Sequence, residues 1–271
     1  MKKIISFIIN HLSFSVCAVC VALLLIGCSE KKVGKTGGFV ERKNASFVLD
    51  GKEYRYVGTN FWYGAILASE GQGGDRARLL RELDKLHELG LDNLRILVGS
   101  DGKRGVMTKV EPTLQESPGV YNDTILAGLD YLLQQMGERG MKAVLYLNNA
   151  WEWSGGYGFY LEQAGAGKAP RPNETSYPEY MSFVSQFSTN TKAQELFFQY
   201  VRDIIGRTNR YTKVPYCDDP AIMSWQIGNE PRAFSDEAKE PFAKWLRQTS
   251  TLIRCLDKNH LISIGSEGIW G

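Results

Sequence analysis

Short apolar runs alternate with longer segments of helical periodicity along most of the chain. Residues 47–56 read as a β-hairpin, because Asp50-Gly51 stands between two β-prone runs and favours a tight turn. Beyond it, leucines and other apolar residues recur three or four positions apart in segments that end at Gly90 or Gly140. The pattern predicts strands at 54–60, 93–98, 142–147, 221–227 and 261–265, and helices at 75–89, 122–139, 192–207 and 241–256.

The alternation of strand and helix predicts an α/β protein with a parallel sheet. A doubly wound open sheet and a (β/α)₈ TIM barrel give the same local pattern. Residues 58–62 read Gly-Thr-Asn-Phe-Trp, which is not a glycine-rich phosphate loop. Polar and aromatic residues follow several different strands and do not gather at one switch point. We therefore expect the barrel, with about its first five βα units present in residues 45–271.

The N-terminal segment 1–28 is typical of a bacterial lipoprotein signal. Lys2 and Lys3 precede an apolar run over 14–27, and the sequence at 25–29 resembles a lipobox. That resemblance implies cleavage before Cys28 and lipid on its thiol, and hence a bacterial cell envelope location, on the periplasmic face or the cell surface. The alternative is a transmembrane anchor, for which the run is short.

Residues 29–44 are charged or small and predict a flexible tether, so that the lipid is the chain's only expected contact with a membrane. The 271 residues are 43% hydrophobic and 23% charged, as in an ordinary globular protein, and the net charge of +2 predicts no nucleic-acid partner. The histidines are dispersed, which predicts no metal site. Cys217 and Cys255 lie in the expected fold, and in an exported protein they either form a disulfide or remain free.

Candidate chemistry follows the fourth predicted strand. Asn229 and Glu230 come directly before Pro231, which cannot extend a sheet ladder, so both side chains are expected at the carboxyl end of the strand. A glutamate there, beside an amide, suits acid/base work on a glycosidic bond. The alternative is a sequence that only turns the chain. Arg95 interrupts an apolar strand and is expected to reach a carboxylate, unless it points outward.

The segments 99–121 and 148–190 are predicted as long functional loops. Aromatic faces in such loops suit stacking on sugar rings, and the tryptophans that follow strands are Trp62, Trp151, Trp153 and Trp270. The alternative is that they pack the loops together. Trp225 and Trp245 are expected in the core. Asn149 is a candidate for bonding a sugar hydroxyl, and Glu152 is expected in a loop salt bridge.

Taken in order, five pieces of the chain resemble glycoside hydrolase family five, in particular its endo-β-1,4-mannanase branch. They are 58–62, 93–96, 147–156, Asn229-Glu230-Pro231-Arg232, and 265–268 (Gly-Ser-Glu-Gly). The resemblance implies that Glu230 is the acid/base, that Asn229 holds a 2-hydroxyl and that Arg95 lies beneath the nucleophile. It also implies that Arg232 and Glu267 line the leaving-group subsites, that β-mannan or a related plant polysaccharide is the substrate, and that no cofactor is needed.

The family retains anomeric configuration and needs a second glutamate, which lies after its seventh strand. The chain ends at Gly271, after the fifth predicted strand. We expect it to be the N-terminal part of a longer product, poorly folded and inactive as written, with the nucleophile beyond residue 271. Glu267 is the other carboxylate at this mouth. Two alternatives stay open: a β-1,4-glucan hydrolase of the same family, and a non-catalytic surface glycan-binding protein.

Overall fold

The computed structural model describes residues 38–103 and 110–268. Its strands are β1 (Glu41–Lys43), β2 (Ser46–Leu49), β3 (Lys52–Glu53), β4 (Gly58–Asn60), β5 (Asn93–Leu97), β6 (Gln115–Ser117), β7 (Val120–Tyr121), β8 (Lys142–Tyr146), β9 (Ile222–Gln226) and β10 (Leu261–Ser263). Its helices are α2 (Gly64–Leu67), α3 (Arg76–Glu88), α4 (Asp123–Glu138), α5 (Gly156–Ala164), α6 (Tyr177–Val184), α7 (Thr191–Ile205) and α8 (Lys239–Leu256). Short 3₁₀ turns are η1 (Glu152–Ser154), η2 (Ser185–Ser188) and η3 (Tyr216–Asp218).

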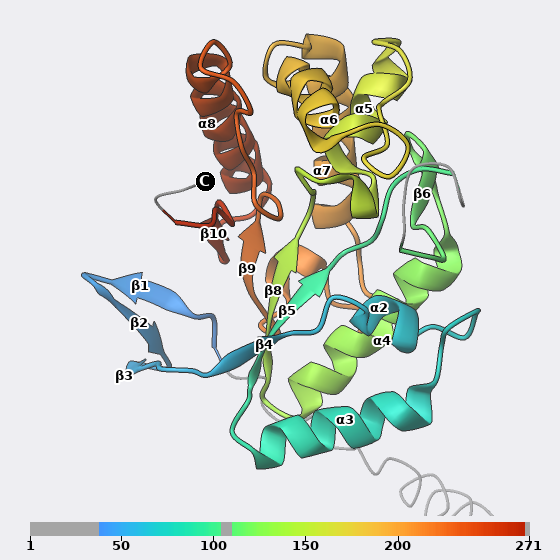
Figure 1. The fold of residues 1–271 in the computed structure, drawn as a ribbon. Helices are drawn as coiled ribbons and strands as arrows, with labels where there is room; N and C mark the ends of the chain where they lie inside the picture. The colour runs from blue at the N-terminus through green and yellow to red at the C-terminus, as the bar shows by residue number, and fades with distance from the viewer. Residues whose placement is uncertain (1–37, 104–109, 269–271) are drawn as a thin grey trace, which may run out of the picture. The chain divides into compact units, whose positions relative to one another are not determined.

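The central sheet is parallel and runs in chain order. Its five strands pair as β10-β9-β8-β5-β4, with helices between successive strands (Figure 1). A doubly wound sheet would reverse its order at a switch point, and this sheet does not. The prediction of the first five strands of a (β/α)₈ barrel is therefore confirmed.

The predicted hairpin is also present, and it begins earlier than expected. Asp50 and Gly51 have φ of 51° and 76°, the pair of positive values that a type I′ turn requires. β2 and β3 pair across this turn, and β1 adds a third antiparallel strand. Because β1 lies at Glu41–Lys43, the tether boundary expected at residue 44 is wrong. The backbone of these residues is paired with β2.

Side chains alternate between the two faces of the central sheet. Leu94 and Ile96 of β5 are fully buried in the main apolar cluster, whereas Arg95 between them is on the opposite face. That opposite face holds a hollow of about 330 Å³ lined in part by Arg95, Val144 and Gln226. Trp225 and Trp245 are buried in the core, as predicted, at 0% and 1% exposure.

The segment 148–190 is not the irregular loop that the sequence suggested. It contains η1, α5, α6 and η2, and it packs α5 against α7. Helix α5 buries most of its first turns, so it has no polar face and its residues show no amphipathic period. The segment 99–121 likewise contains the small hairpin of β6 and β7.

Several expectations for the ends of the chain fall outside the described residues. They are the signal segment 1–28, its lipidation at Cys28, the first part of the tether, and Trp270. Within the described part, no helix has the length and apolar character that crossing a membrane requires. Cys217 and Cys255 are both free thiols, which answers the question that the sequence left open.

Candidate active site

Asn229 and Glu230 are held at the carboxyl end of β9 by the strands on either side. The Asn229 N–H donates to the Asn148 carbonyl at 2.8 Å, and the Glu230 N–H donates to the Gly265 carbonyl at 3.0 Å. The first carbonyl follows β8 and the second follows β10. Glu230 has φ of 51°, a left-handed conformation that is uncommon outside glycine and concentrates at functional sites. The prediction that both side chains are presented at this end of the sheet is confirmed.

Arg95 joins three strands beneath this pair. Its guanidinium donates to Gln226 Oε1 at 2.7 Å, to Asn229 Oδ1 at 3.0 Å and to Asn60 Oδ1 at 3.3 Å. Within the described residues its hydrogen bonds go to three amide oxygens, and contact with a carboxylate beyond them stays a prediction. Burial lowers the pKa of Arg95, and the charge of nearby Glu230 acts in the opposite direction. Arg95 therefore orients Asn229 and places a positive charge near Glu230.

Asn149 is 1% exposed, and its amide bonds lie within the protein. Its Oδ1 accepts from the Trp151 N–H at 3.1 Å and from Asn229 Nδ2 at 3.2 Å, and its Nδ2 donates to Ser154 Oγ at 2.9 Å. These bonds hold Asn229 and the chain at Trp151. Contact of Asn149 with a sugar hydroxyl stays a prediction.

Trp151 contacts the carboxylate of Glu230. Its indole Nε1 donates to Glu230 Oε2 at 2.6 Å. Arg232 lies with its Cζ 5.3 Å from the centroid of the Trp151 ring, and it forms an ion pair with Glu267. The structure thus brings Glu230, Arg232 and Glu267 to one place, as the sequence predicted. It places Glu267 against Arg232.

The other predicted aromatic residues differ in their surroundings. Trp62, which follows β4, is 43% exposed and meets Tyr63 edge to face, so much of its surface is open. Trp153 packs beside the small buried cluster of Leu97, Val110 and Tyr146. Glu152 is 6% exposed within the turn η1, and its loop salt bridge stays a prediction. Trp62 remains the candidate for sugar stacking.

Sequence reasoning missed several residues of this site. Gln226 and Asn60 hold Arg95, and a signal for Gln226 was present, since it is a polar residue in an apolar strand at a position that faces the same side as Arg95. Tyr177, Tyr180 and Phe234 surround Trp151, and they carry no local signal because they come from α6 and from the segment after β9.

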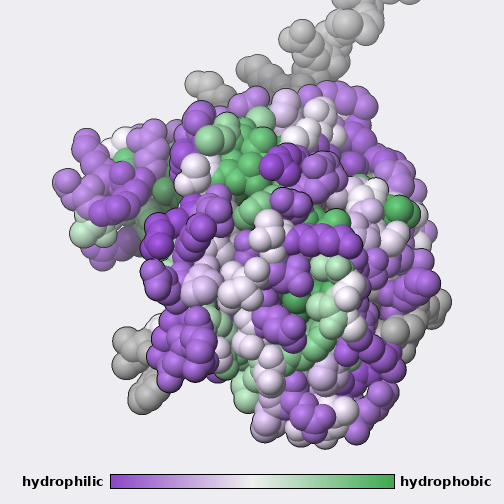
Figure 2. Space-filling model, turned by 90° about the horizontal axis from the view of Figure 1, so that it is seen from above, coloured by the Kyte–Doolittle hydropathy of each residue, from purple (hydrophilic) through white to green (hydrophobic). Residues whose placement is uncertain are grey.

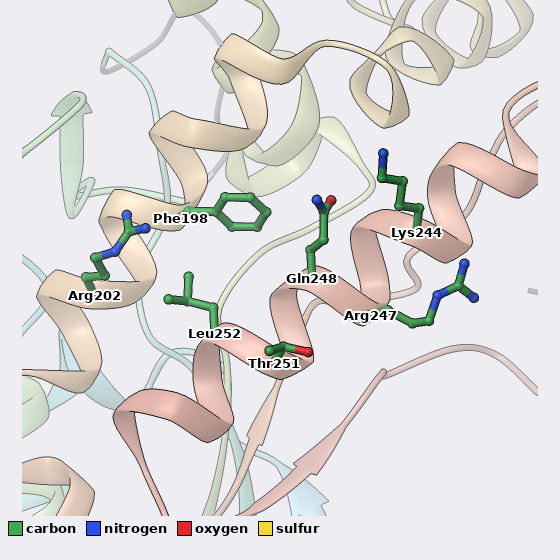
Figure 3. Close-up of a pocket in the computed structure, with 7 residues that line it drawn as sticks. All are labelled: Phe198, Arg202, Lys244, Arg247, Gln248, Thr251 and Leu252. Atoms are coloured by element: carbon green, nitrogen blue, oxygen red, sulfur yellow. The ribbon is translucent and has the colours of Figure 1, made fainter.

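Figure 2 views the molecule from above, the direction in which strands β8 and β9 point in Figure 1, and hydrophobic surface shows there between hydrophilic residues. A separate groove of about 450 Å³ lies in the helix layer, between α7 and α8, where Phe198, Gln248 and Leu252 point into the gap (Figure 3). None of the seven residues that line it is a carboxylate or belongs to the predicted site. In the described residues, no three His, Cys, Asp or Glu side chains are grouped to hold a metal.

A strand-end Asn-Glu pair on a parallel barrel sheet, with an arginine beneath it, is the arrangement of a barrel glycoside hydrolase. Comparison with known families agrees. The family model described as GH family 5 beta-mannosidase-like matches residues 37–271. The chain belongs to glycoside hydrolase family 5, in this mannosidase-like group.

Its relatives carry names that are consistent with this family. Mannan endo-1,4-beta-mannosidase 1 of Oryza sativa is 30% identical over 255 residues, which cover 94% of this chain and 55% of the rice protein. Mannan endo-1,4-beta-mannosidase 7 of Arabidopsis thaliana is 30% identical over 236 residues, which cover 87% of this chain and 50% of the plant protein. The chain thus spans about half the length of these curated relatives.

Solved structures show the same relation. The glycoside hydrolase family 5 mannosidase from Rhizomucor miehei matches with a TM-score of 0.79 at 34% identity, covering 87% of this chain and 57% of the fungal one. The endo-1,4-beta-mannanase from the same fungus matches with a TM-score of 0.68 at 28% identity, covering 85% of this chain and 61% of that enzyme. The described residues therefore correspond to part of each of these enzymes.

Proposed function

We propose that the protein is a retaining endo-hydrolase of β-1,4-mannosidic bonds in mannan-type polysaccharides. The observation that carries this proposal is Glu230, presented at the carboxyl end of β9 beside Asn229, whose amide is oriented by Arg95. Support for the sugar comes from the relatives, whose names describe mannan endo-1,4-beta-mannosidases.

In this reaction Glu230 acts first as an acid. It gives its proton to the glycosidic oxygen while the C–O bond breaks, and a second carboxylate forms a glycosyl ester at the sugar's anomeric carbon. Glu230 then accepts a proton from water, which attacks the ester and frees the second carboxylate. Asn229 is suited to bind the 2-hydroxyl of the same sugar, with Arg95 fixing the direction of its amide.

The second carboxylate is proposed to come from outside the described residues. Glu267 already pairs with Arg232, which places its charge in an ion pair at the rim of the site. The chain covers 57% of the R. miehei mannosidase and 61% of the mannanase, so much of a complete barrel has no counterpart in it. Trp62, which is 43% exposed, is proposed as a platform for a mannosyl unit.

The test uses the gene product read to its natural stop codon. We expect it to lower the viscosity of β-mannan quickly while few reducing ends are released, and Glu230→Gln to lose at least a hundredfold in rate. A 2-fluoro mannosyl fluoride should label the nucleophile, which peptide mapping would then locate. Equal or greater activity on a β-1,4-glucan would refute the mannan assignment. Mannan binding without cleavage would indicate a glycan-binding protein.

A second candidate is a mannosidase that acts on short saccharides. The observation that favours it is the higher TM-score and identity to the R. miehei mannosidase, one structure of which is described in complex with mannosyl-fructose. Such an enzyme would release mannose from oligosaccharides and would leave the viscosity of mannan almost unchanged. Product analysis against time separates the two.

The protein is further proposed to act at the cell envelope, held there by lipid on Cys28. The support is the sequence at 25–29 and the basic start of the segment before it. Labelled palmitate should be incorporated into the wild-type protein and not into Cys28→Ala. Labelling of both forms, or of neither, would refute the anchor.

A further inference from the structure

Trp151 follows β8, and protein groups lie against its partly buried indole ring. The Tyr180 ring lies nearly parallel to it, at 20° with the centroids 6.4 Å apart, and the Arg232 Cζ is 5.3 Å from its centroid. Tyr177 and Phe234 meet it edge to face, with centroids at 5.9 and 5.3 Å. A sugar platform needs an open aromatic face, and Trp62, at 43% exposure, offers more of one than the partly buried Trp151.

What Trp151 directs at the site is its N–H group. An indole has one hydrogen-bond donor and no acceptor, and here that donor is 2.6 Å from Glu230 Oε2. Within the described residues, Glu230 Oε1 makes no hydrogen bond. The two oxygens of the carboxylate therefore have different surroundings, and one of them is left for substrate.

Trp151 is held through its backbone at its own strand end and through its ring by residues that follow β9 and β10. The Trp151 backbone N–H donates to Asn149 Oδ1 at 3.1 Å, on the β8 side. On the other side, Glu267 follows β10 and pairs with Arg232, whose guanidinium lies over the indole. Glu267 thus pairs with Arg232, Arg232 lies over the ring of Trp151, and Trp151 bonds Glu230.

We propose that Trp151 is a positioning residue for the acid/base, not a sugar platform. Its N–H holds Glu230 Oε2 and turns Oε1 toward the glycosidic oxygen, and the Glu267–Arg232 pair keeps the indole in the plane that this requires. The kinetic part of the proposal rests on the proposed glycosidase function. The contact itself does not.

The kinetic test compares Trp151→Phe, which keeps a ring and removes the donor, with Trp62→Ala in the full gene product. We expect Trp151→Phe to lower kcat on mannan oligosaccharides about 10- to 100-fold with KM within about twofold, since general acid catalysis contributes 10²–10⁴. We expect Trp62→Ala to raise KM. If Trp151→Phe kept wild-type kcat while Trp151→Ala raised KM, Trp151 would be a platform and the proposal would be wrong.

A change of leaving group separates positioning from general damage. The dinitrophenolate of a dinitrophenyl β-mannoside leaves without needing a proton from the acid. Trp151→Phe should therefore lower kcat on this substrate by at most about threefold. An equal loss on both substrates would indicate a structural effect and overturn the proposal.

A spectroscopic measurement decides the contact without turnover. The ultraviolet resonance Raman difference between wild type and Trp151→Phe isolates the Trp151 indole, and its N–H band should move to a more weakly bonded position in Glu230→Ala. A band that stays in place would refute the contact. A band that moves in a protein unable to cleave any mannoside would refute the proposed function and leave the contact standing.

Discussion

Asp101 lies just beyond the end of β5, and its replacement by asparagine should flatten the pH dependence of stability. Its side chain is 2% exposed and accepts a hydrogen bond from Gln115 Nε2 at 3.0 Å. Its backbone N–H donates to the Ser154 carbonyl at 2.9 Å, so it joins the segment after β5 to the segment that carries Trp151. Burial raises the pKa of Asp101 to about 8, against hydrogen bonds from Gln115 and the Gly156 backbone that act to lower it.

The direction of the effect follows from proton binding. Between pH 3.8 and about 8 the folded protein keeps the proton on Asp101 and the unfolded chain has lost it, so raising the pH favours unfolding. The stability that the proton on Asp101 gives to the folded protein is complete below pH 3.8 and is lost as the pH rises to about 8. From pH 5 to pH 8 this single group should lower the free energy of unfolding by about 3.5 kcal/mol.

The assay is urea unfolding at pH 5, 6, 7 and 8, followed by tryptophan fluorescence, for the wild type and Asp101→Asn. Asparagine keeps an acceptor for Gln115 and cannot ionise. Around Asp101 are Tyr160, Tyr121 and Tyr200, whose pKa values burial raises, so they stay neutral in this range. Groups common to both proteins cancel in the difference. If the two proteins lost stability in parallel from pH 5 to 8, the assigned pKa of Asp101 would be wrong.

Two further changes test how the loops and helices are held. Gly156→Ala should destabilise the protein by more than about 3 kcal/mol in urea unfolding, because φ is 57° and a Cβ would lie 2.0 Å from the Asn149 carbonyl. The control is Gly165→Ala, where φ is 87° and the space is open, and which should destabilise the protein by only about 1–2 kcal/mol. Asp130→Ala should lower the free energy of unfolding by about 3–5 kcal/mol, since Asp130 is fully buried and bonded to Arg207. Asp123→Ala should lower it by under about 1 kcal/mol, since Asp123 is exposed. Equal losses within either pair would contradict these structural reasons.

The regular elements of the barrel could be predicted because their signals are local. Helices α3 and α4 begin one residue from their expected starts, after Asp75 and Asn122, whose side chains accept from backbone N–H groups of the first turn. The strands were found from short apolar runs, and their order from the alternation with helices. Helix α5 was missed because its residues 156–161 are all buried and glycine at 155, 156 and 158 obscures the helical signal. Helix α6 has eight residues and buries only Tyr180 and Val184, which is too short an apolar period to recognise.

The site could be predicted in its composition and only partly in its contacts. Glu230 and Asn229 were recognised from the polar pair that ends an apolar strand. The hydrogen-bond partners of Arg95 could not be predicted, because a guanidinium in a strand can bond any oxygen that the neighbouring strands bring near it. The role of Trp151 depends on Tyr177, Tyr180 and Phe234, which lie far from it in sequence.

The conformation of Glu230 links these observations. A positive φ costs a residue with a side chain about 1–2 kcal/mol, and here the neighbours on both sides supply the bonds that hold it. Asn229 is fixed toward β8, Glu230 is fixed toward β10, and Gly265 allows the close approach, since a Cβ there would lie 2.0 Å from the Gly228 carbonyl. The backbone conformation fixes the direction in which the Glu230 side chain leaves the main chain. The indole N–H of Trp151 fixes the position of its carboxylate oxygen Oε2. Both are needed to leave one oxygen directed at a substrate.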